Sequence, residues 1–179
     1  MEIAVFGGGC FWCTEAVFQR LNGVESVVSG YAGGNKENPS YQEVSYEETG
    51  HAEVVKVEFD PTKISYKQLL EVFWYVHDPT TLNQQGNDVG TQYRSIILYT
   101  SDEQKREAEQ SIKEMQEKYN NQPIAKRVVT EIKPLVKFYT AEEYHQQYFE
   151  KNPSQPYCQL IIGPKLEHFE MMFSNLLKK

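Results

Sequence analysis

The sequence has no long apolar run and no excess of basic residues. Of its 179 residues 40% are hydrophobic, yet no stretch is long and apolar enough to be read as a membrane-spanning helix. Eighteen lysines and arginines stand against 25 aspartates and glutamates, so the formal net charge is −7. Proteins that bind nucleic acid or an anionic membrane usually carry a Lys/Arg cluster, and this chain has none. We therefore expect no nucleic-acid partner and no membrane partner.

Cysteine is scarce, and a secretory signal is missing. The start, Met1-Glu2-Ile3, lacks the basic segment and the apolar segment of about 7–15 residues that such a signal needs. Three cysteines cannot all pair within one chain, which favours redox, catalytic or metal chemistry in the cytoplasm over a disulfide framework. The length fits a single domain, residues 1–179, with a proper core. Because no apolar stripe requires a partner, we expect a monomer.

Strand-like and helix-like segments alternate along the chain. Apolar or alternating runs predict strands at 3–6, 24–29, 51–59, 93–99 and 128–132. Helical spacing and capping residues predict helices at 11–22, 66–77, 101–119, 140–149 and from 164 onward. The turn-rich segments between them are long enough to carry function, at 30–50 and 80–92. This interleaving predicts one mixed α/β or α+β sandwich.

A cysteine stands where the first strand passes into the first helix, after Gly7-Gly8-Gly9. The first turn of a helix offers free N–H groups and the positive end of the dipole, so we expect a lowered pKa and a nucleophilic thiolate at Cys10. The glycines allow close approach of backbone or ligand. Phe11 and Trp12 follow at positions that we expect to be exposed or half-exposed.

Cys10-x-x-Cys13 allows three uses. A zinc site needs about four ligands, and one cysteine pair with distant Cys158 and four scattered histidines makes a poor set. A thioredoxin-like disulfide pair also sits at a helix start, but it leaves the third cysteine and the neighbouring aromatics unused. The residues favour the third use, a single nucleophile at Cys10 whose oxidised form is resolved by Cys13 or Cys158.

Glu53 is the second candidate for chemistry. In the strand 51–59 its side chain shares a face with Val55 and Val57, while Lys56 lies on the other face. A carboxyl on an apolar face is harder to ionise, so its pKa rises and it can donate a proton near neutral pH. The alternative is that the strand end is frayed and Glu53 is solvated.

Several further side chains lie in or beside the loops around this site. Tyrosines at 41, 93 and 148 offer phenolic donors, although each is equally typical of a packing residue. His145 and Tyr148 are three residues apart and share one face of the helix expected over 140–149. Asp88, in a loop flanked by glycines, is by default a turn residue.

With these residues in view, the chain closely resembles the peptide methionine sulfoxide reductase A family. The resemblance runs from about residue 3 to 158, and it rests on many fragments in the same order. They are Gly9-Cys10-Phe11-Trp12, Gly30-Tyr31-Ala32-Gly33-Gly34, Asn38-Pro39-Ser40-Tyr41, Thr49-Gly50-His51-Ala52-Glu53, Gln85-Gly86-Asn87-Asp88, Gly90-Thr91-Gln92-Tyr93-Arg94-Ser95, Ala141-Glu142-Glu143-Tyr144-His145-Gln146-Gln147-Tyr148 and Lys151-Asn152-Pro153.

The resemblance implies reduction of the S epimer of methionine sulfoxide, free or in proteins, without a metal or organic cofactor. Cys10 matches the nucleophile and Glu53 the acid that protonates the sulfoxide oxygen. Tyr41 and Tyr93 match helping hydroxyl donors. The remaining matches concern substrate binding: a methyl pocket at Phe11 and Trp12, and supporting positions at Asp88, His145 and Tyr148. The implied fold is a two-layer α+β sandwich of ferredoxin-like type with long functional loops.

The resemblance also implies that a second thiol condenses with oxidised Cys10 and that thioredoxin reduces the resulting disulfide. Cys158 follows an aromatic residue after Asn152-Pro153, as the usual recycling cysteine does, in a tail that we expect to be mobile. Cys13 is one helical turn from Cys10, so a local disulfide is also possible. We prefer Cys158, and a Cys10–Cys13 bond that is later transferred to Cys158 stays open. Two alternative functions are considered beside the reductase: a thioredoxin-like oxidoreductase, and a non-catalytic binding module whose aromatic cage holds a thioether or methylated ligand.

Overall fold

The protein is built around one six-stranded mixed sheet. A computed structural model describes residues 1–46 and 48–179. The strands lie in the order β7-β6-β1-β3-β2-β8, antiparallel except for the parallel pair β6–β7. Their bounds are β1 Glu2–Gly7, β2 Val24–Ala32, β3 Ala52–Phe59, β6 Ile96–Tyr99, β7 Glu131–Pro134 and β8 Phe138–Thr140. A second, two-stranded sheet joins β4 Gln84–Gln85 to β5 Asp88–Val89.

The helices complete the expected ferredoxin-like pattern. Along the chain β1, α1, β2, β3, α3 and β6 form the β-α-β-β-α-β unit, with the strand order β6-β1-β3-β2. The α-helices are α1 Phe11–Phe18, α2 Tyr41–Ser45, α3 Tyr66–Val76, α4 Asp102–Asn120, α5 Tyr148–Lys151 and α6 Gly163–Met172. Short 3₁₀ turns cover Thr91–Tyr93, Glu143–His145 and Ser174–Leu176, and a π-helical turn covers Cys158–Ile162. The predicted two-layer α+β fold is confirmed.

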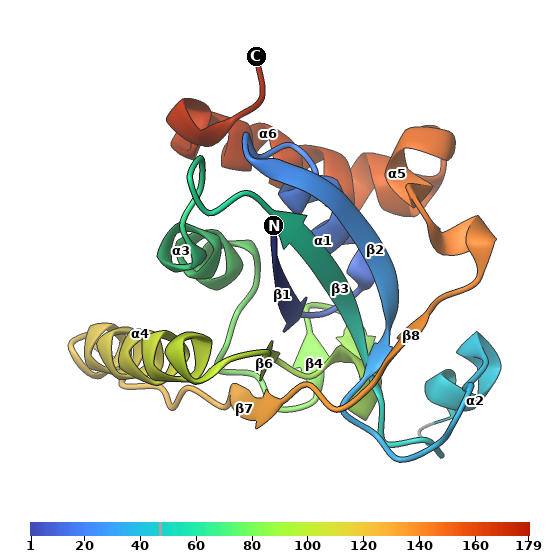
Figure 1. Ribbon diagram of the computed structural model, residues 1–179, viewed down its shortest axis with the longest axis horizontal. Helices are drawn as coiled ribbons and strands as arrows, with labels where there is room; N and C mark the ends of the chain where they lie inside the picture. The colour runs from blue at the N-terminus through green and yellow to red at the C-terminus, as the bar shows by residue number, and fades with distance from the viewer. Residues whose placement is uncertain (47) are drawn as a thin grey trace.

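The main core lies between the sheet and the helices α1, α3 and α6 (Figure 1). Phe6 on β1 stacks on Phe18 of α1 and Phe73 of α3, with ring centroids 5.3 and 5.1 Å apart. Each fully buried side chain of this size contributes about 1.5–3 kcal/mol. This packing fixes where β1 ends and α1 begins, which is the position of Cys10.

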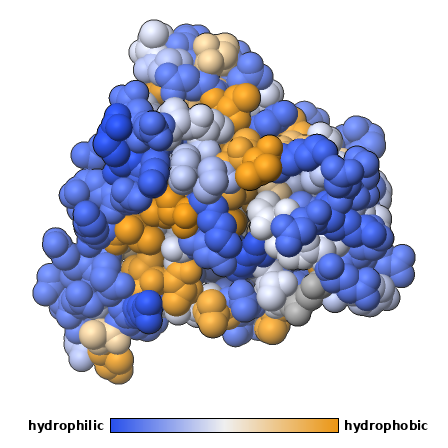
Figure 2. Space-filling view, turned by 60° about the horizontal axis from the view of Figure 1, so that its bottom comes forward, coloured by the Kyte–Doolittle hydropathy of each residue, from blue (hydrophilic) through white to orange (hydrophobic). Residues whose placement is uncertain are grey.

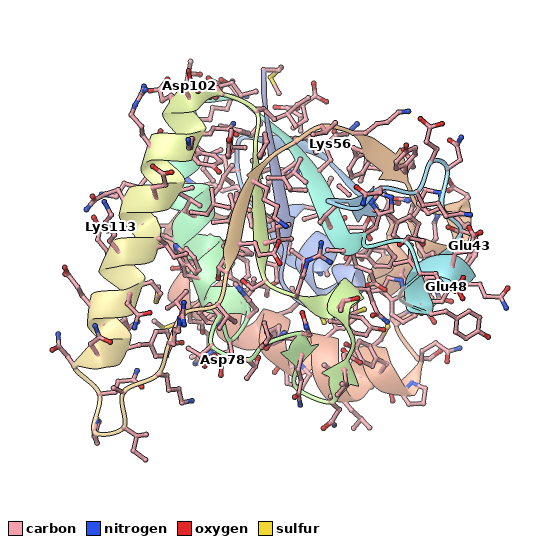
Figure 3. All side chains as sticks on the ribbon, turned by 90° about the horizontal axis from the view of Figure 1, so that it is seen from below. Glu43, Glu48, Lys56, Asp78, Asp102 and Lys113 are labelled. Atoms are coloured by element: carbon pink, nitrogen blue, oxygen red, sulfur yellow. The ribbon has the colours of Figure 1, made fainter. Side chains whose placement is uncertain are left out.

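The opposite face of the sheet is covered by the connection between β7 and β8. Leu135 and Phe138 pack on a smaller cluster that includes Val54 and Ile96. Figure 3 shows this crossing beside the labelled Lys56, whose Nζ lies 4.9 Å from the centre of the Phe138 ring. With the bottom of Figure 1 turned forward, apolar side chains form a band between hydrophilic surfaces (Figure 2). After this connection the chain forms β8 and then reaches the residues around 145.

Some predicted boundaries are wrong. The first helix ends at Phe18 rather than near residue 22, because Leu21 instead pairs with Leu177 from the end of the chain. The strand expected from 93 begins at Ile96, and the strand expected at 128–132 lies at 131–134. Each error concerns a segment whose ends are set by distant contacts, which a local pattern does not contain.

The helix expected over 140–149 is also wrong. A 3₁₀ turn at Glu143–His145 is followed by Gln147 in the left-handed conformation (φ 53°), and α5 then begins at Tyr148. The side chain of Gln146 bonds instead to the backbone of Ser29 on β2, accepting from its N–H at 3.0 Å and donating to its C=O at 2.9 Å. This bonding to the sheet replaces the expected helical turn.

None of the helices in the described part of the chain has both the length and the hydropathy needed to span a membrane.

Candidate active site

Cys10 is the N-cap of α1, directly after β1. The turn before it needs glycine at two positions. Gly9 has φ +94°, a left-handed conformation, and a Cβ there would lie 2.7 Å from Gln85. A Cβ on Gly8 would lie 2.9 Å from the His77 ring. The glycines therefore allow Gln85 of β4 and His77, the C-cap of α3, to pack against the turn that precedes the cysteine.

The Cys10 thiol is half-buried, and its pKa is raised well above its ordinary value of 9.0. Burial is the main cause, followed by the nearby Glu53 carboxylate and then by Cys13. The Trp12 backbone N–H acts in the opposite direction and favours the thiolate. The expectation of a lowered pKa at this helix start is therefore wrong, because the loss of hydration on burial raises the pKa more than the helix N-terminus lowers it.

Glu53 lies on β3 and is only 2% exposed, so the alternative of a frayed, solvated strand end is wrong. Its Oε2 accepts a hydrogen bond of 3.1 Å from the backbone N–H of Phe11, the residue after Cys10. Burial raises the pKa of the carboxyl to about 8, against the effect of this bond, and Asp88 adds to the rise. Glu53 is therefore mostly protonated at neutral pH, beside the thiol.

Tyr41 and Tyr93 enter the same space from two loops. Tyr41 begins α2, and Tyr93 ends the 3₁₀ turn before β6. Burial raises the pKa of both phenols, and the charge of Glu53 is the next cause for each, with Cys10 also contributing. The structure thus brings both predicted tyrosines within electrostatic range of Glu53 and Cys10, and both phenols stay protonated at neutral pH.

The predicted aromatic pair divides into a buried ring and an accessible one. Phe11 is 1% exposed and packs on Tyr31 and His145, so its expected exposure is wrong. Trp12 is partly exposed and stacks face to face on Tyr148, with centroids 3.7 Å apart and planes within 5°. Trp12 therefore forms the accessible aromatic wall, and the buried Phe11 ring packs on the same His145 that Trp12 contacts.

His145 and Tyr148 meet Trp12 although they do not share a helix. The indole Nε1 of Trp12 donates to His145 Nδ1 at 3.0 Å, across 133 residues of chain. Burial lowers the pKa of His145, so the imidazole is neutral and carries its proton on Nε2. The two residues reach Trp12 from either side of the left-handed Gln147.

Asp88 on β5 holds a tyrosine that the sequence reasoning missed. The phenol of Tyr157 donates to Asp88 Oδ2 at 2.8 Å and lies 3.9 Å from Cys13 Sγ. The Tyr157 ring also packs edge-on against Trp12, with centroids 5.9 Å apart. Tyr157 therefore joins the C-terminal segment to Asp88 on β5 and to Trp12 and Cys13 on α1.

The two other thiols are buried, and no disulfide joins the three cysteines. Cys13 is 5% exposed and Cys158 is fully buried. Cys158 begins a π-helical turn that continues into α6 and packs in the main core, so the tail that carries it is folded here. Cys13 raises the pKa of Cys10, and Cys158 raises the pKa of Cys13, so Cys13 lies within electrostatic range of both other thiols. The cysteines thus follow one another from the site into the core.

Comparison with protein-family models matches residues 2–176 to the family described as peptide methionine sulfoxide reductase. The chain belongs to this family. Peptide methionine sulfoxide reductase MsrA of Saccharolobus solfataricus is 53% identical over 178 residues, 99% of this chain and 98% of the relative. The protein of the same name from Sulfolobus acidocaldarius is 56% identical over 175 residues, 98% of this chain and 97% of the relative.

Solved structures agree with this membership in the reductase family. Methionine sulfoxide reductase A of Corynebacterium diphtheriae has a TM-score of 0.81 at 38% identity, covering 85% of this chain and 75% of that one. Reduced Mxr1 of Saccharomyces cerevisiae gives 0.78 at 38% identity, with 88% of each chain covered. Mxr1 in complex with Trx2 gives 0.55 at 28% identity, covering 82% and 84%. Membership in this family excludes both alternative functions, the thioredoxin-like oxidoreductase and the binding module.

Two further residues, Glu142 and Glu15, shape this reductase site. The Glu142 carboxylate accepts hydrogen bonds from the Tyr31 phenol and from the Tyr41 backbone N–H, each at 3.1 Å, and so ties α2 to β2. Glu15 on α1 is 1% exposed and bonds to the backbone at Gln147. Like Tyr157, these glutamates give only weak local signals, since an acidic residue in a helix is by default a solvated one. Among the described residues, no group of three or more His, Cys, Asp and Glu side chains is placed to hold a metal.

Proposed function

We propose that the chain, as one domain of residues 1–179, reduces the S epimer of methionine sulfoxide, free or in proteins, with Cys10 as nucleophile and Glu53 as acid. One observation carries these roles. A buried carboxyl with a pKa of about 8 accepts a hydrogen bond from the residue that follows the half-exposed thiol. Sulfoxide reduction needs a sulfur nucleophile and a proton for the departing oxygen at the same place, and this pair supplies both.

In the first step the Cys10 sulfur attacks the sulfoxide sulfur while Glu53 transfers a proton to the sulfoxide oxygen. The oxygen then passes to Cys10, methionine leaves, and Cys10 becomes a sulfenic acid. The sulfoxide sulfur gains two electrons, and the cysteine sulfur loses two. Tyr41 and Tyr93 are proposed to donate hydrogen bonds to the same oxygen, since their raised pKa values keep them protonated.

The substrate methyl group is proposed to lie against Trp12, with Phe11 beneath it. The stack of Tyr148 on Trp12 and the Trp12–His145 hydrogen bond support this wall. Asp88 contributes through Tyr157, which closes the other side. An apolar pocket with a few fixed polar groups is the general form of a small-ligand site.

Recycling needs a second thiol. Its sulfur displaces hydroxide from the sulfenic acid, so a disulfide forms and one water leaves. Both Cys13 and Cys158 remain candidates as resolving residues. The order of neighbours Cys10, Cys13, Cys158 favours a first Cys10–Cys13 bond, followed by exchange onto Cys158. Complete burial of Cys158 requires its segment to move before it can take part.

Thioredoxin is the proposed reductant, and the cytoplasm, where thiols stay reduced, is the proposed location. Mxr1, a structural neighbour of this chain, has been solved in complex with Trx2. This chain is more similar to reduced Mxr1, at a TM-score of 0.78, than to that complex, at 0.55. The difference indicates that Mxr1 in the complex departs further from this fold than reduced Mxr1 does.

The experiment is turnover of each epimer of a methionine sulfoxide peptide with dithiothreitol. We expect loss of the S epimer only, abolished by Cys10→Ser and slowed at least about 100-fold by Glu53→Gln, because a lost general acid costs about that factor. Turnover of neither epimer by folded wild type contradicts the proposal.

With thioredoxin as reductant, Cys13→Ser and Cys158→Ser should each stop recycling after one turnover, and full turnover by either variant removes that cysteine from the route.

A further inference from the structure

The accessible wall of the site depends on a segment that has little structure of its own. Residues 141–148 carry His145 and Tyr148 onto Trp12, yet the segment contains one 3₁₀ turn and a left-handed residue, Gln147. The helix α5 that follows has four residues and no side-chain cap on its N-terminus. Something outside the segment must therefore hold Tyr148 in place.

Glu15 is placed to do this. It lies on α1 three residues after Trp12, so the two side chains project from neighbouring positions on one side of the helix. Its Oε2 accepts a 2.8 Å hydrogen bond from the backbone N–H of Gln147. The Tyr148 N–H likewise favours the ionised form of the carboxyl, although burial raises its pKa overall.

The two contacts bind the same stretch of chain at two points. Trp12 holds His145 by a hydrogen bond and Tyr148 by stacking, and Glu15 holds the peptide groups between them. A side chain 1% exposed gains nothing from water, so burying a carboxyl there costs free energy unless backbone donors compensate for the lost hydration. The hydrogen bond from the Gln147 N–H supplies this compensation to Oε2, whereas Oε1 is buried with no hydrogen-bond partner among the described residues.

We propose that Glu15 is a positioning residue that sets the Tyr148 ring on Trp12 and thereby shapes the methyl pocket. The inference rests on the proposed role of Trp12 in substrate binding. A residue of this kind affects how well substrate is held more than how fast bound substrate reacts, because Cys10 and Glu53 keep their own contacts.

The test compares Glu15→Ala and Glu15→Gln with Glu150→Ala in turnover of the S-sulfoxide peptide with dithiothreitol. Glu150 is a matched control, because it also joins α5 to the end of α1, through an exposed 3.0 Å bridge to Arg20. We expect Glu15→Ala to raise KM at least about tenfold, with kcat within about threefold of wild type. The KM of Glu15→Gln should fall between these two proteins, since its amide oxygen still accepts one N–H. The control Glu150→Ala should have the KM and kcat of wild type. Unchanged KM in both Glu15 variants overturns the inference.

A second readout is independent of turnover. In a Trp74→Phe background Trp12 is the remaining tryptophan, and Glu15→Ala should shift its emission to longer wavelength as Tyr148 leaves the ring. If Glu15→Ala does not fold, the same comparison is made with Glu15→Gln, for which an emission identical to that of the background overturns the inference. Inactive wild type with the expected spectral shift would contradict the proposed function and leave the placement of Tyr148 by Glu15 supported.

Discussion

At the residue scale, Cys10 and Glu53 form a pair in which both groups are harder to ionise than free side chains. A free glutamate ionises well before a free thiol, but here the carboxyl has a pKa of about 8 and the thiol is raised above 9.0. Because the charge of Glu53 raises the pKa of the thiol, the two groups titrate as a pair, and the loss of one proton belongs to the pair. In the proposed mechanism the reactive form carries one proton, on Glu53, and a thiolate on Cys10.

This coupling predicts the pH dependence of the chemical step. In single-turnover reduction by pre-reduced enzyme, we expect the rate to rise as pH approaches about 8, where the pair loses its first proton, and to fall again once the second is lost. Glu53→Gln should lack the rise near pH 8 and follow thiolate formation alone. Stopped-flow measurement from pH 6 to 10 tests this. A wild-type profile that coincides in shape with that of Glu53→Gln would contradict it.

At the scale of elements, the position of β8 decides where the 141–148 segment begins. Gly30 on β2 faces β8, and a Cβ there would lie 2.3 Å from the Phe138 ring and 2.4 Å from the Tyr139 carbonyl oxygen. Backbone cannot yield as a flexible side chain does. The two strands can therefore pair closely only because this residue is glycine.

We expect Gly30→Ala to lower the free energy of unfolding by about 1–3 kcal/mol, the usual cost of overpacking, and to weaken substrate binding as β8 shifts. Urea unfolding and KM for the sulfoxide peptide are the measurements. Ser26→Ala, at the exposed end of the same strand, is the control and should change neither. A Gly30→Ala variant as stable as wild type would show that β8 moves away at no cost.

The elements also show what the sequence could predict and what it could not. The alternation in 51–59 placed Glu53 on the buried face, and the capping residues placed α3 and α4 within about one residue. The break in the helix expected over 140–149 escaped prediction, because its cause is the bonding of Gln146 to Ser29, 117 positions earlier. The raised pKa of Cys10 escaped for the same reason: burial comes from the assembled fold, whereas the helix start is local.

At the scale of the whole molecule, the buried Glu53 links stability to pH. In the unfolded chain its carboxyl loses its proton near 4.5, and in the folded protein near 8. Between these values the folded state binds one more proton than the unfolded state, so this group makes the protein less stable as pH rises. Relative to Glu53→Gln, wild type should lose about 1.4 kcal/mol per pH unit across this window. Urea unfolding of both proteins at pH 6 and 8 tests the sign, and a constant difference would contradict it.

The site is assembled from the two ends of the chain, which has a consequence for its synthesis. Trp12 bonds to His145, 133 positions later, and Cys13 lies beside Tyr157, 144 positions later. A ribosome adds about 5–20 residues per second, so about 7 to 30 seconds pass between synthesis of Cys10 and of the residues that enclose it. During that interval the nascent chain holds a thiol without its pocket, and the enzyme becomes able to repair other proteins only when its own translation is nearly finished.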